Sequence, residues 1–187
     1  MNENRLNLWK RDRLLMMSWS TFGMAIDALK MSVGSLKPRP DVIVGIGRGG
    51  WMIAVPLSHA LEVTECYGIR IIRNVSEQVY SSRTKPVVLQ SPPRTVLNNQ
   101  TVLLVDDIAG DGGTIAAAKE ALRDLGAKAV QTAVLVLNTA GNCPVDTYAV
   151  SVDDWVVFPW ESDSVQSGKA RDVELQTVDI SVKSPRE

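Results

Sequence analysis

Several features that mark specialised protein classes are scarce in this sequence of 187 residues. It has only two cysteines, Cys66 and Cys143, which have neither the number nor the spacing of a disulfide framework or a zinc site, so we expect two reduced thiols. The single histidine, His59, falls inside a predicted helix, where a structural or surface role is favoured over general-base catalysis. Neither residue type therefore contributes to the predicted site.

An excess of charge of one sign is also missing. The chain has 20 Lys and Arg against 21 Asp and Glu, which excludes non-specific attraction of nucleic acid. No run approaches the ~20 apolar residues of a membrane span. The apolar stretch 14–19 follows basic residues, as in a secretion signal, but Asp27 and Lys30 interrupt the continuation and no small-residue cleavage site follows. We expect a soluble, cytoplasmic protein without nucleic-acid or membrane partners.

The length and an apolar content of 45% fit one domain with a sizeable core. Residues 1–13 are polar and basic and are predicted to form a loose lead-in. The domain is predicted over 14–161, and residues 162–187 form a polar tail with alternating Val and Leu whose order is left open.

Strand, turn and helix recur along the domain. Apolar positions at three- and four-residue spacing predict an amphipathic helix over 19–33. Further apolar runs predict strands at 41–46, 67–72, 101–105, 130–137 and 147–152 and helices at 51–61 and 114–125, the last ending before Gly126. Continuous apolar strands followed by helices imply an α/β fold with a parallel sheet covered on both faces, which binds ligands beyond the carboxyl ends of its strands.

Residues 73–100 interrupt this pattern, because they are polar and rich in Ser, Pro, Arg and Asn. A connection of this length with little periodicity is either a functional flap or a disordered insertion.

The segment from Val102 to Thr114 carries most of the predicted chemistry. Asp106 and Asp107 leave a buried strand and enter a glycine turn that opens a helix. Carboxylates there can accept hydrogen bonds from vicinal hydroxyls or hold Mg²⁺, while backbone N–H groups can bind a phosphate; the N–H donors expected are those of Gly112, Gly113 and Thr114. This combination suits a phosphorylated ribose; the alternative is that both acids only cap the turn.

The segment closely resembles the signature of the type I phosphoribosyltransferases, in which a strand leads to two acids, two variable positions and a Thr-Gly-x-Thr phosphate cradle. The resemblance implies a central parallel sheet flanked by helices, with a small hood and a flexible flap. It also implies Mg²⁺-dependent transfer of a phosphoribosyl group from phosphoribosyl pyrophosphate to a purine-like nucleobase, in the context of purine salvage. Asp106 and Asp107 would then hold the metal and orient the ribose hydroxyls.

Two further segments add to the resemblance. The glycine-rich residues 45–50 resemble the pyrophosphate loop of the family, which implies that Arg48 and Gly49 bind pyrophosphate and that the bond joining them is cis in some states. Residues 154–161 resemble the hood of the xanthine-guanine subgroup, which spans about 147–161 here. There the base would contact Trp155, by stacking, and Val156, while Trp160 is assigned to the core.

The resemblance also suggests residues outside these motifs. In the flap, Arg83 and Lys85, with Arg73 as a weaker candidate, would close over pyrophosphate and exclude water, and a solvated loop is nearly as well supported. Asn138 stands where xanthine-guanine enzymes carry a lysine that contacts the base. Dimers are common in the family, which implies a homo-oligomer.

The sequence departs from the family at two positions. Gly110 stands where purine members carry an acid near the base, and Asp111 replaces the cradle hydroxyl. Three hypotheses follow for Asp111: it turns to the base and acts as the missing catalytic acid, it binds a free 5-hydroxyl, or catalysis has been lost. The alternatives to a transferase are therefore a nucleotide sensor and an enzyme acting on a ribosyl ligand without the 5-phosphate.

Overall fold

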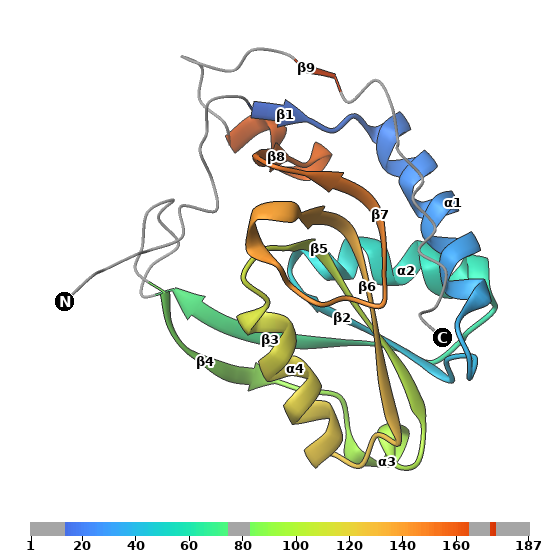
Figure 1. The fold of residues 1–187 in the computed structure, drawn as a ribbon. Coiled ribbons are helices and arrows are strands. Elements are labelled where there is room, and N and C mark those ends of the chain that lie inside the picture. The colour runs from blue at the N-terminus through green and yellow to red at the C-terminus, as the bar shows by residue number, and fades with distance from the viewer. Residues whose placement is uncertain (1–13, 75–82, 165–172, 175–187) are drawn as a thin grey trace.

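The computed structural model describes residues 14–74, 83–164 and 173–174 (Figure 1). Its helices are α1 (Trp19–Ser35), α2 (Gly49–Leu61), α3 (Arg94–Leu97) and α4 (Gly113–Asp124), with two 3₁₀ helices, η1 (Thr139–Gly141) and η2 (Pro159–Ser164). Its strands are β1 (Leu14–Met16), β2 (Val42–Gly47), β3 (Cys66–Asn74), β4 (Arg83–Gln90), β5 (Thr101–Ala109), β6 (Ala129–Asn138), β7 (Thr147–Val152), β8 (Trp155–Val157) and β9 (Val173–Glu174). Within the described ranges, no helix has the length and apolarity that crossing a membrane requires.

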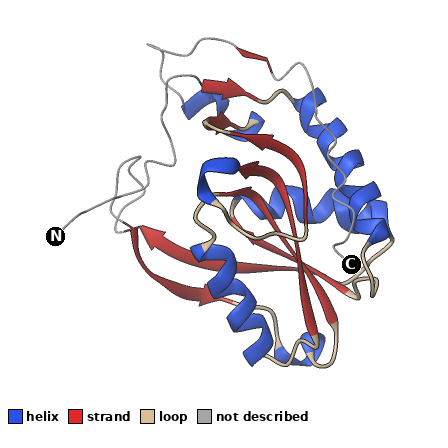
Figure 2. Cartoon of the chain, viewed as in Figure 1, coloured by secondary structure: helices blue, strands red, loops and turns tan. Residues whose placement is uncertain are grey.

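Six strands form the central sheet in the order β4-β3-β2-β5-β6-β7. Every neighbouring pair is parallel except β3 and β4, so the one antiparallel strand lies at an edge. Helices cover both faces (Figure 2): α1 and α2 pack on one hydrophobic cluster and α4 on the other. The predicted α/β fold is confirmed.

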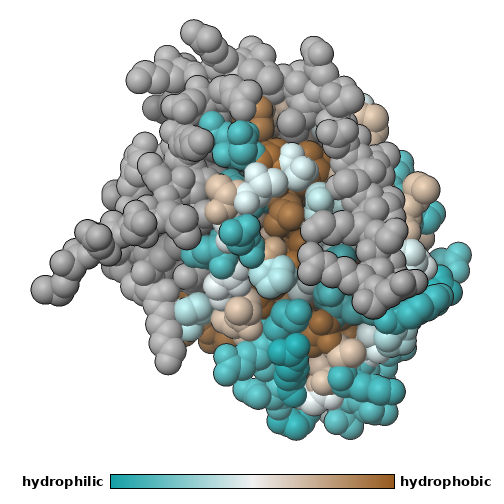
Figure 3. Space-filling view, in the orientation of Figure 1, coloured by the Kyte–Doolittle hydropathy of each residue, from teal (hydrophilic) through white to brown (hydrophobic). Residues whose placement is uncertain are grey.

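Local sequence accounts for the start of α1 and the end of α4. Ser18 caps α1, since its hydroxyl accepts a hydrogen bond of 3.1 Å from the N–H of Thr21. After α4 the chain turns at Gly126, whose φ of +99° is strained for residues with a Cβ. On the face seen in Figure 3, polar side chains gather over α4, whose buried side comprises Ile115, Ala118 and Leu122.

A second, three-stranded sheet and η2 are here called the hood. The predicted bounds of 147–161 need correction, because β7 belongs to the central sheet while β1 and β9 pair in the smaller one. The smaller sheet has the order β8-β1-β9, and β1 pairs in parallel with both neighbours. The sequence did not predict β1 as a strand, because three residues are too few to show a period. The predicted core role of Trp160 is confirmed: its ring stacks on Phe158 with centroids 4.9 Å apart and meets Phe22 edge-on at 5.6 Å.

The prediction for residues 73–100 needs correction. Strand β3 extends to Asn74, β4 pairs with it in antiparallel register, and α3 follows, so the disordered-insertion hypothesis is wrong for the described part of this segment. The sequence missed β4 because its stability comes from pairing of Val87 with Ile72 and of Val88 with Ile71, and because Pro86 is tolerated only at a sheet edge. Residues 75–82 lie outside the described ranges.

Candidate functional site

The sheet places the two glycine-rich segments side by side. Strands β2 and β5 are parallel neighbours, with Gly45 opposite Val105 at the end of the register. The residues that follow, the loop into α2 and the acids of β5, therefore meet at the carboxyl edge of the sheet, where open α/β sheets bind ligands. The sequence predicted a ligand site at this edge of the sheet, but the placement of β2 beside β5 comes from the structure.

Glycine is required where the α2 loop meets β5. A Cβ on Gly49 would overlap Oδ2 of Asp107, and a Cβ on Gly50 would overlap the carbonyl oxygen of Val105. A Cβ on Gly45 would in turn lie 2.7 Å from the carbonyl oxygen of Gly50. The loop can rest against the Asp107 carboxyl only because these three side chains are absent.

The predicted position of the cis peptide bond is wrong by one residue. The structure has the bond between Gly47 and Arg48 in cis, whereas the expected bond was that between Arg48 and Gly49. A Cβ on Gly47 would lie 2.5 Å from the Trp51 ring, so this position has no room for a side chain. Arg48 itself is exposed.

Strand β5 continues through both acids. Pairing with β6 extends to Ala109 opposite Leu137, so Asp106 and Asp107 are strand residues and the predicted end at residue 105 was too early. Oδ1 of Asp106 accepts a hydrogen bond of 3.0 Å from the N–H of Asp107, and Oδ1 of Asp107 accepts one of 2.7 Å from the N–H of Ile108.

The acid pair is held in a desolvated, negatively charged environment. Burial and then the charge of Asp107 raise the pKa of Asp106 well above its usual range. Burial and then the charge of Glu161 raise the pKa of Asp107 to about 6. A divalent cation between these carboxylates would oppose both shifts by favouring the ionised forms, and Mg²⁺ characteristically takes one or two protein carboxylates together with substrate phosphates. Within the described ranges, no cluster of three or more acidic, histidine or cysteine side chains offers a metal site.

Glu161 is a site residue that the sequence did not identify. It lies in η2, accepts a hydrogen bond of 3.3 Å at Oε2 from the N–H of Phe158, and is near enough to Asp107 to raise the pKa of that carboxyl. Burial raises the pKa of Glu161, while the charge of Arg48 opposes this shift. The hood therefore places the Glu161 carboxyl near the acid pair and the α2 loop. The only signal in the sequence was that Glu161 follows Trp160 in the segment that resembles the hood.

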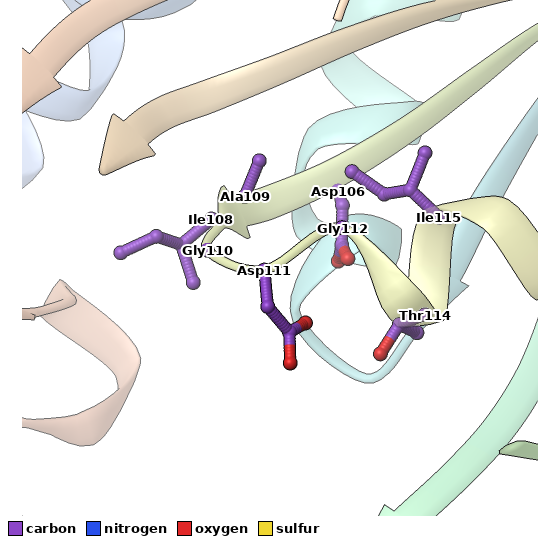
Figure 4. A pocket seen from close by; sticks show the side chains of 8 residues that line it. All are labelled: Asp106, Ile108, Ala109, Gly110, Asp111, Gly112, Thr114 and Ile115. Atoms are coloured by element: carbon purple, nitrogen blue, oxygen red, sulfur yellow. The ribbon is translucent and has the colours of Figure 1, made fainter. Parts of the chain in front are cut away.

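The loop before α4 lines a small pocket of about 80 Å³ (Figure 4). Its lining comprises Asp106, Ile108, Ala109, Gly110, Asp111, Gly112, Thr114 and Ile115. Gly112 has a φ of +75°, which favours glycine. Oδ1 of Asp111 accepts a hydrogen bond of 3.1 Å from the N–H of Gly113. Figure 4 shows the oxygens of Asp106, Asp111 and Thr114 pointing to the same side of the loop.

The segment after β6 supports this loop from behind. A Cβ on Gly141 would overlap the carbonyl oxygen of Gly110, and Sγ of Cys143 lies 2.7 Å from where a Cβ on Gly112 would be. Asn138, predicted to contact the base, is fully buried, and its Oδ1 accepts a hydrogen bond of 2.9 Å from the N–H of Ala140. Its observed role is to cap η1, and the sequence did not show the supporting role of Gly141 and Cys143.

The other residues singled out from the sequence lie in α2, in the hood and in strands β3 and β4. The Val156 side chain is buried in the core, which leaves any contact with a base to its backbone. Trp155 lies in β8 and Arg83 and Lys85 lie in β4, but their side chains, like that of Arg73, are outside the described part of the structure. His59 is exposed in the last turn of α2, away from the carboxyl edge of the sheet, as expected for a residue without a catalytic role.

Comparisons with known proteins agree with this geometry. A family model described as a phosphoribosyl transferase domain matches residues 24–166. The adenine phosphoribosyltransferase of Bordetella parapertussis is 30% identical over 105 residues, which are 54% of this chain and 54% of that protein, so the chain spans about half the length of the curated relatives it matches.

Solved structures of phosphoribosyltransferases are similar to this chain over more of its length. The purine phosphoribosyltransferase of Pyrococcus horikoshii superposes with a TM-score of 0.67 at 31% identity, covering 79% of this chain and 94% of that one. The xanthine-guanine-hypoxanthine phosphoribosyltransferase of Helicobacter pylori has a TM-score of 0.69 at 24% identity, covering 81% and 96%, and supports the fold.

Proposed function

Because the chain belongs to the phosphoribosyltransferase family, we propose that it transfers a phosphoribosyl group from phosphoribosyl pyrophosphate to a purine-like nucleobase in a Mg²⁺-dependent reaction. The observation that carries this proposal is the contact between the Asp107 carboxyl and Gly49, which joins the acid pair to the glycine loop. The purine enzymes among its relatives support a purine-like acceptor.

The proposed reaction asks the protein mainly to position its substrates. The bond between the anomeric carbon and pyrophosphate breaks with its electron pair on the leaving oxygen, while a ring nitrogen of the base bonds to the same carbon and the base releases a proton to solvent. Asp106 and Asp107 orient the ribose hydroxyls, and Arg48 with the backbone of its loop faces the pyrophosphate. Bound Mg²⁺ would neutralise charge on the leaving group. In this proposal Trp155 stacks on the base.

Binding and turnover measurements test the proposal together. Calorimetric titration with phosphoribosyl pyrophosphate should show binding that requires Mg²⁺, and a panel of purines should reveal turnover to a monophosphate. Asp107→Asn should lower kcat/KM by at least about 100-fold, whereas Asp124→Asn, which removes a charge from the exposed far end of α4, should leave it unchanged. Donor binding without turnover of any base would contradict the transferase proposal.

The sensor hypothesis remains the second candidate because Gly110 stands where purine enzymes of the family carry an acid near the base. Gly110 lines the pocket but has no side chain to accept a proton from a bound base. A sensor should bind the donor or purine nucleotides with Mg²⁺ dependence and show no turnover with any base in the panel.

A further inference from the structure

A carboxylate already lies at the end of α4 where the ribose end of the proposed site would hold a phosphate. Asp111 accepts the hydrogen bond from the N–H of Gly113, one of the unpaired donors at the start of this 12-residue helix. The amino-terminal end of a helix carries partial positive charge, and the first turn of α4, which is fully described, has no acid of its own. Asp111 therefore occupies a donor that a phosphate oxygen would use.

The pocket beside this loop has an acidic lining. Asp106 and Asp111 are the ionisable residues among the eight that line it, and these eight described residues include no lysine or arginine. The charge of Asp111 acts within the site, because after burial it is the main cause that raises the pKa of the Cys143 thiol, against a smaller opposing effect of Lys119. A phosphate dianion would enter a space with two carboxyl groups, whereas a hydroxyl could donate a hydrogen bond to one of them.

We infer that Asp111 determines specificity at the ribose end of the site, so that a nucleoside with a free 5-hydroxyl binds more tightly than its 5-monophosphate. The carboxylate repels the phosphate and occupies the N–H of Gly113, while the hydroxyl meets neither obstacle. The inference rests on the proposed function, since both require a ribosyl site beside Asp106. The donor is then held mainly at its pyrophosphate end, near Arg48 and Gly49.

Matched ligand pairs test this inference. Adenosine and AMP, and guanosine and GMP, are titrated into the protein by calorimetry in EDTA, so that no metal bridges Asp111 and phosphate. For the wild type, the nucleoside of the better-bound pair should have the lower Kd, by on the order of tenfold. Raising the ionic strength should narrow this ratio, because Asp111 is exposed and its charge is screened by salt.

Three variants separate charge from hydrogen bonding. Asp111→Asn keeps a similar shape without the charge and should strengthen monophosphate binding with little effect on the nucleoside. Asp111→Thr also frees the N–H of Gly113 and should reverse the preference, with the monophosphate bound about tenfold more tightly. Asp124→Asn removes a charge from the other end of α4 and should leave the ratio as in the wild type.

The outcomes distinguish the two proposals. A wild type that binds monophosphates more tightly than nucleosides, or a ratio that Asp111→Thr leaves unchanged, would overturn the role of Asp111 while leaving the transferase proposal intact. If none of the four ligands binds the wild type, there is no ribosyl site, and both the inference and the proposed function fail.

Discussion

At the scale of single residues, the geometry of the site depends on glycines that have no Cβ. Gly45, Gly49 and Gly50 let the α2 loop reach β5, and the same approach buries the acids that the loop covers. The close approach that glycine permits therefore contributes to the desolvation that raises the pKa of both carboxyl groups.

Replacing Gly49 by alanine should disrupt this contact. The new Cβ would overlap Oδ2 of Asp107, so we expect a loss of about 1–3 kcal/mol of unfolding free energy and weaker Mg²⁺-dependent donor binding. Urea unfolding and calorimetry measure both quantities. Gly23→Ala is the matched control: its Cβ would meet no atom within 4 Å in the middle of α1, and it should stabilise the protein by about 0.5–1 kcal/mol. Equal unfolding free energies and equal donor binding of the two variants would contradict the packing argument.

The acid pair should make stability depend on pH. Because folding raises the pKa of Asp107 from 3.8 to about 6, the folded state binds its proton more tightly than the unfolded state. The contribution of this group to stability is therefore greatest below pH 3.8, falls as the pH rises towards 6, and is constant above it. Urea unfolding between pH 4 and pH 7 should show this decline, with a smaller slope in Asp107→Asn. If Asp107→Asn leaves the slope of unfolding free energy against pH unchanged, other titratable groups cause the decline.

Binding of a metal should show the opposite dependence. Mg²⁺ requires ionised carboxylates, so Mg²⁺-dependent donor binding should weaken as the pH falls through about 6, the pKa of Asp107. Calorimetry at constant ionic strength measures this, and affinity that is independent of pH between 5 and 7 would indicate that the pair does not hold the metal.

At the scale of elements, η1 supports the loop before α4. Its start is fixed by the cap from Asn138 and by a hydrogen bond of 3.1 Å from the Thr139 hydroxyl to the carbonyl oxygen of Val152. Because Gly141 packs directly on Gly110, the geometry of the pocket depends on a segment that does not line it.

Gly141→Ala should therefore weaken the binding of ribosyl ligands. Its Cβ would push against the carbonyl oxygen of Gly110, and we expect at least about a tenfold rise in the Kd of the better-bound nucleoside. Asn142→Gly is the control, since Asn142 is exposed with a φ of +51° that glycine adopts readily. A Gly141→Ala variant that binds like Asn142→Gly would show that the loop holds its shape without this support.

At the scale of the whole molecule, aromatic packing joins the hood to α1. Trp160 contacts Trp19, Phe22 and Phe158, and the next residue in η2 is Glu161, which acts on Asp107. Hood packing and site electrostatics are thus coupled through two adjacent residues.

Removing the Trp160 ring should affect both properties. Trp160→Ala should lower the unfolding free energy by about 2–4 kcal/mol, because a large ring that packs against the core is lost. If the loosened hood withdraws Glu161, the pH-dependent decline of stability assigned to Asp107 should become smaller. Met31→Ala, at a side chain that is 69% exposed, should change stability by less than about 0.5 kcal/mol. A normal pH profile in a destabilised Trp160→Ala variant would show that Glu161 is held independently of the ring.

The sequence by itself determined what depends on neighbours along the chain. Apolar periodicity located α1, Gly126 marked the end of α4, the apolar runs located the strands that are covered on both faces, and Asp106 and Asp107 with the two glycine-rich loops indicated the family. These features follow from local propensity and from the rule that parallel strands end at one edge. Tertiary structure decided the rest: the edge strand β4, the hood strand β1, the approach of Glu161 to Asp107, and the packing of Gly141 on Gly110. Each joins residues far apart in sequence, so no local pattern encodes it.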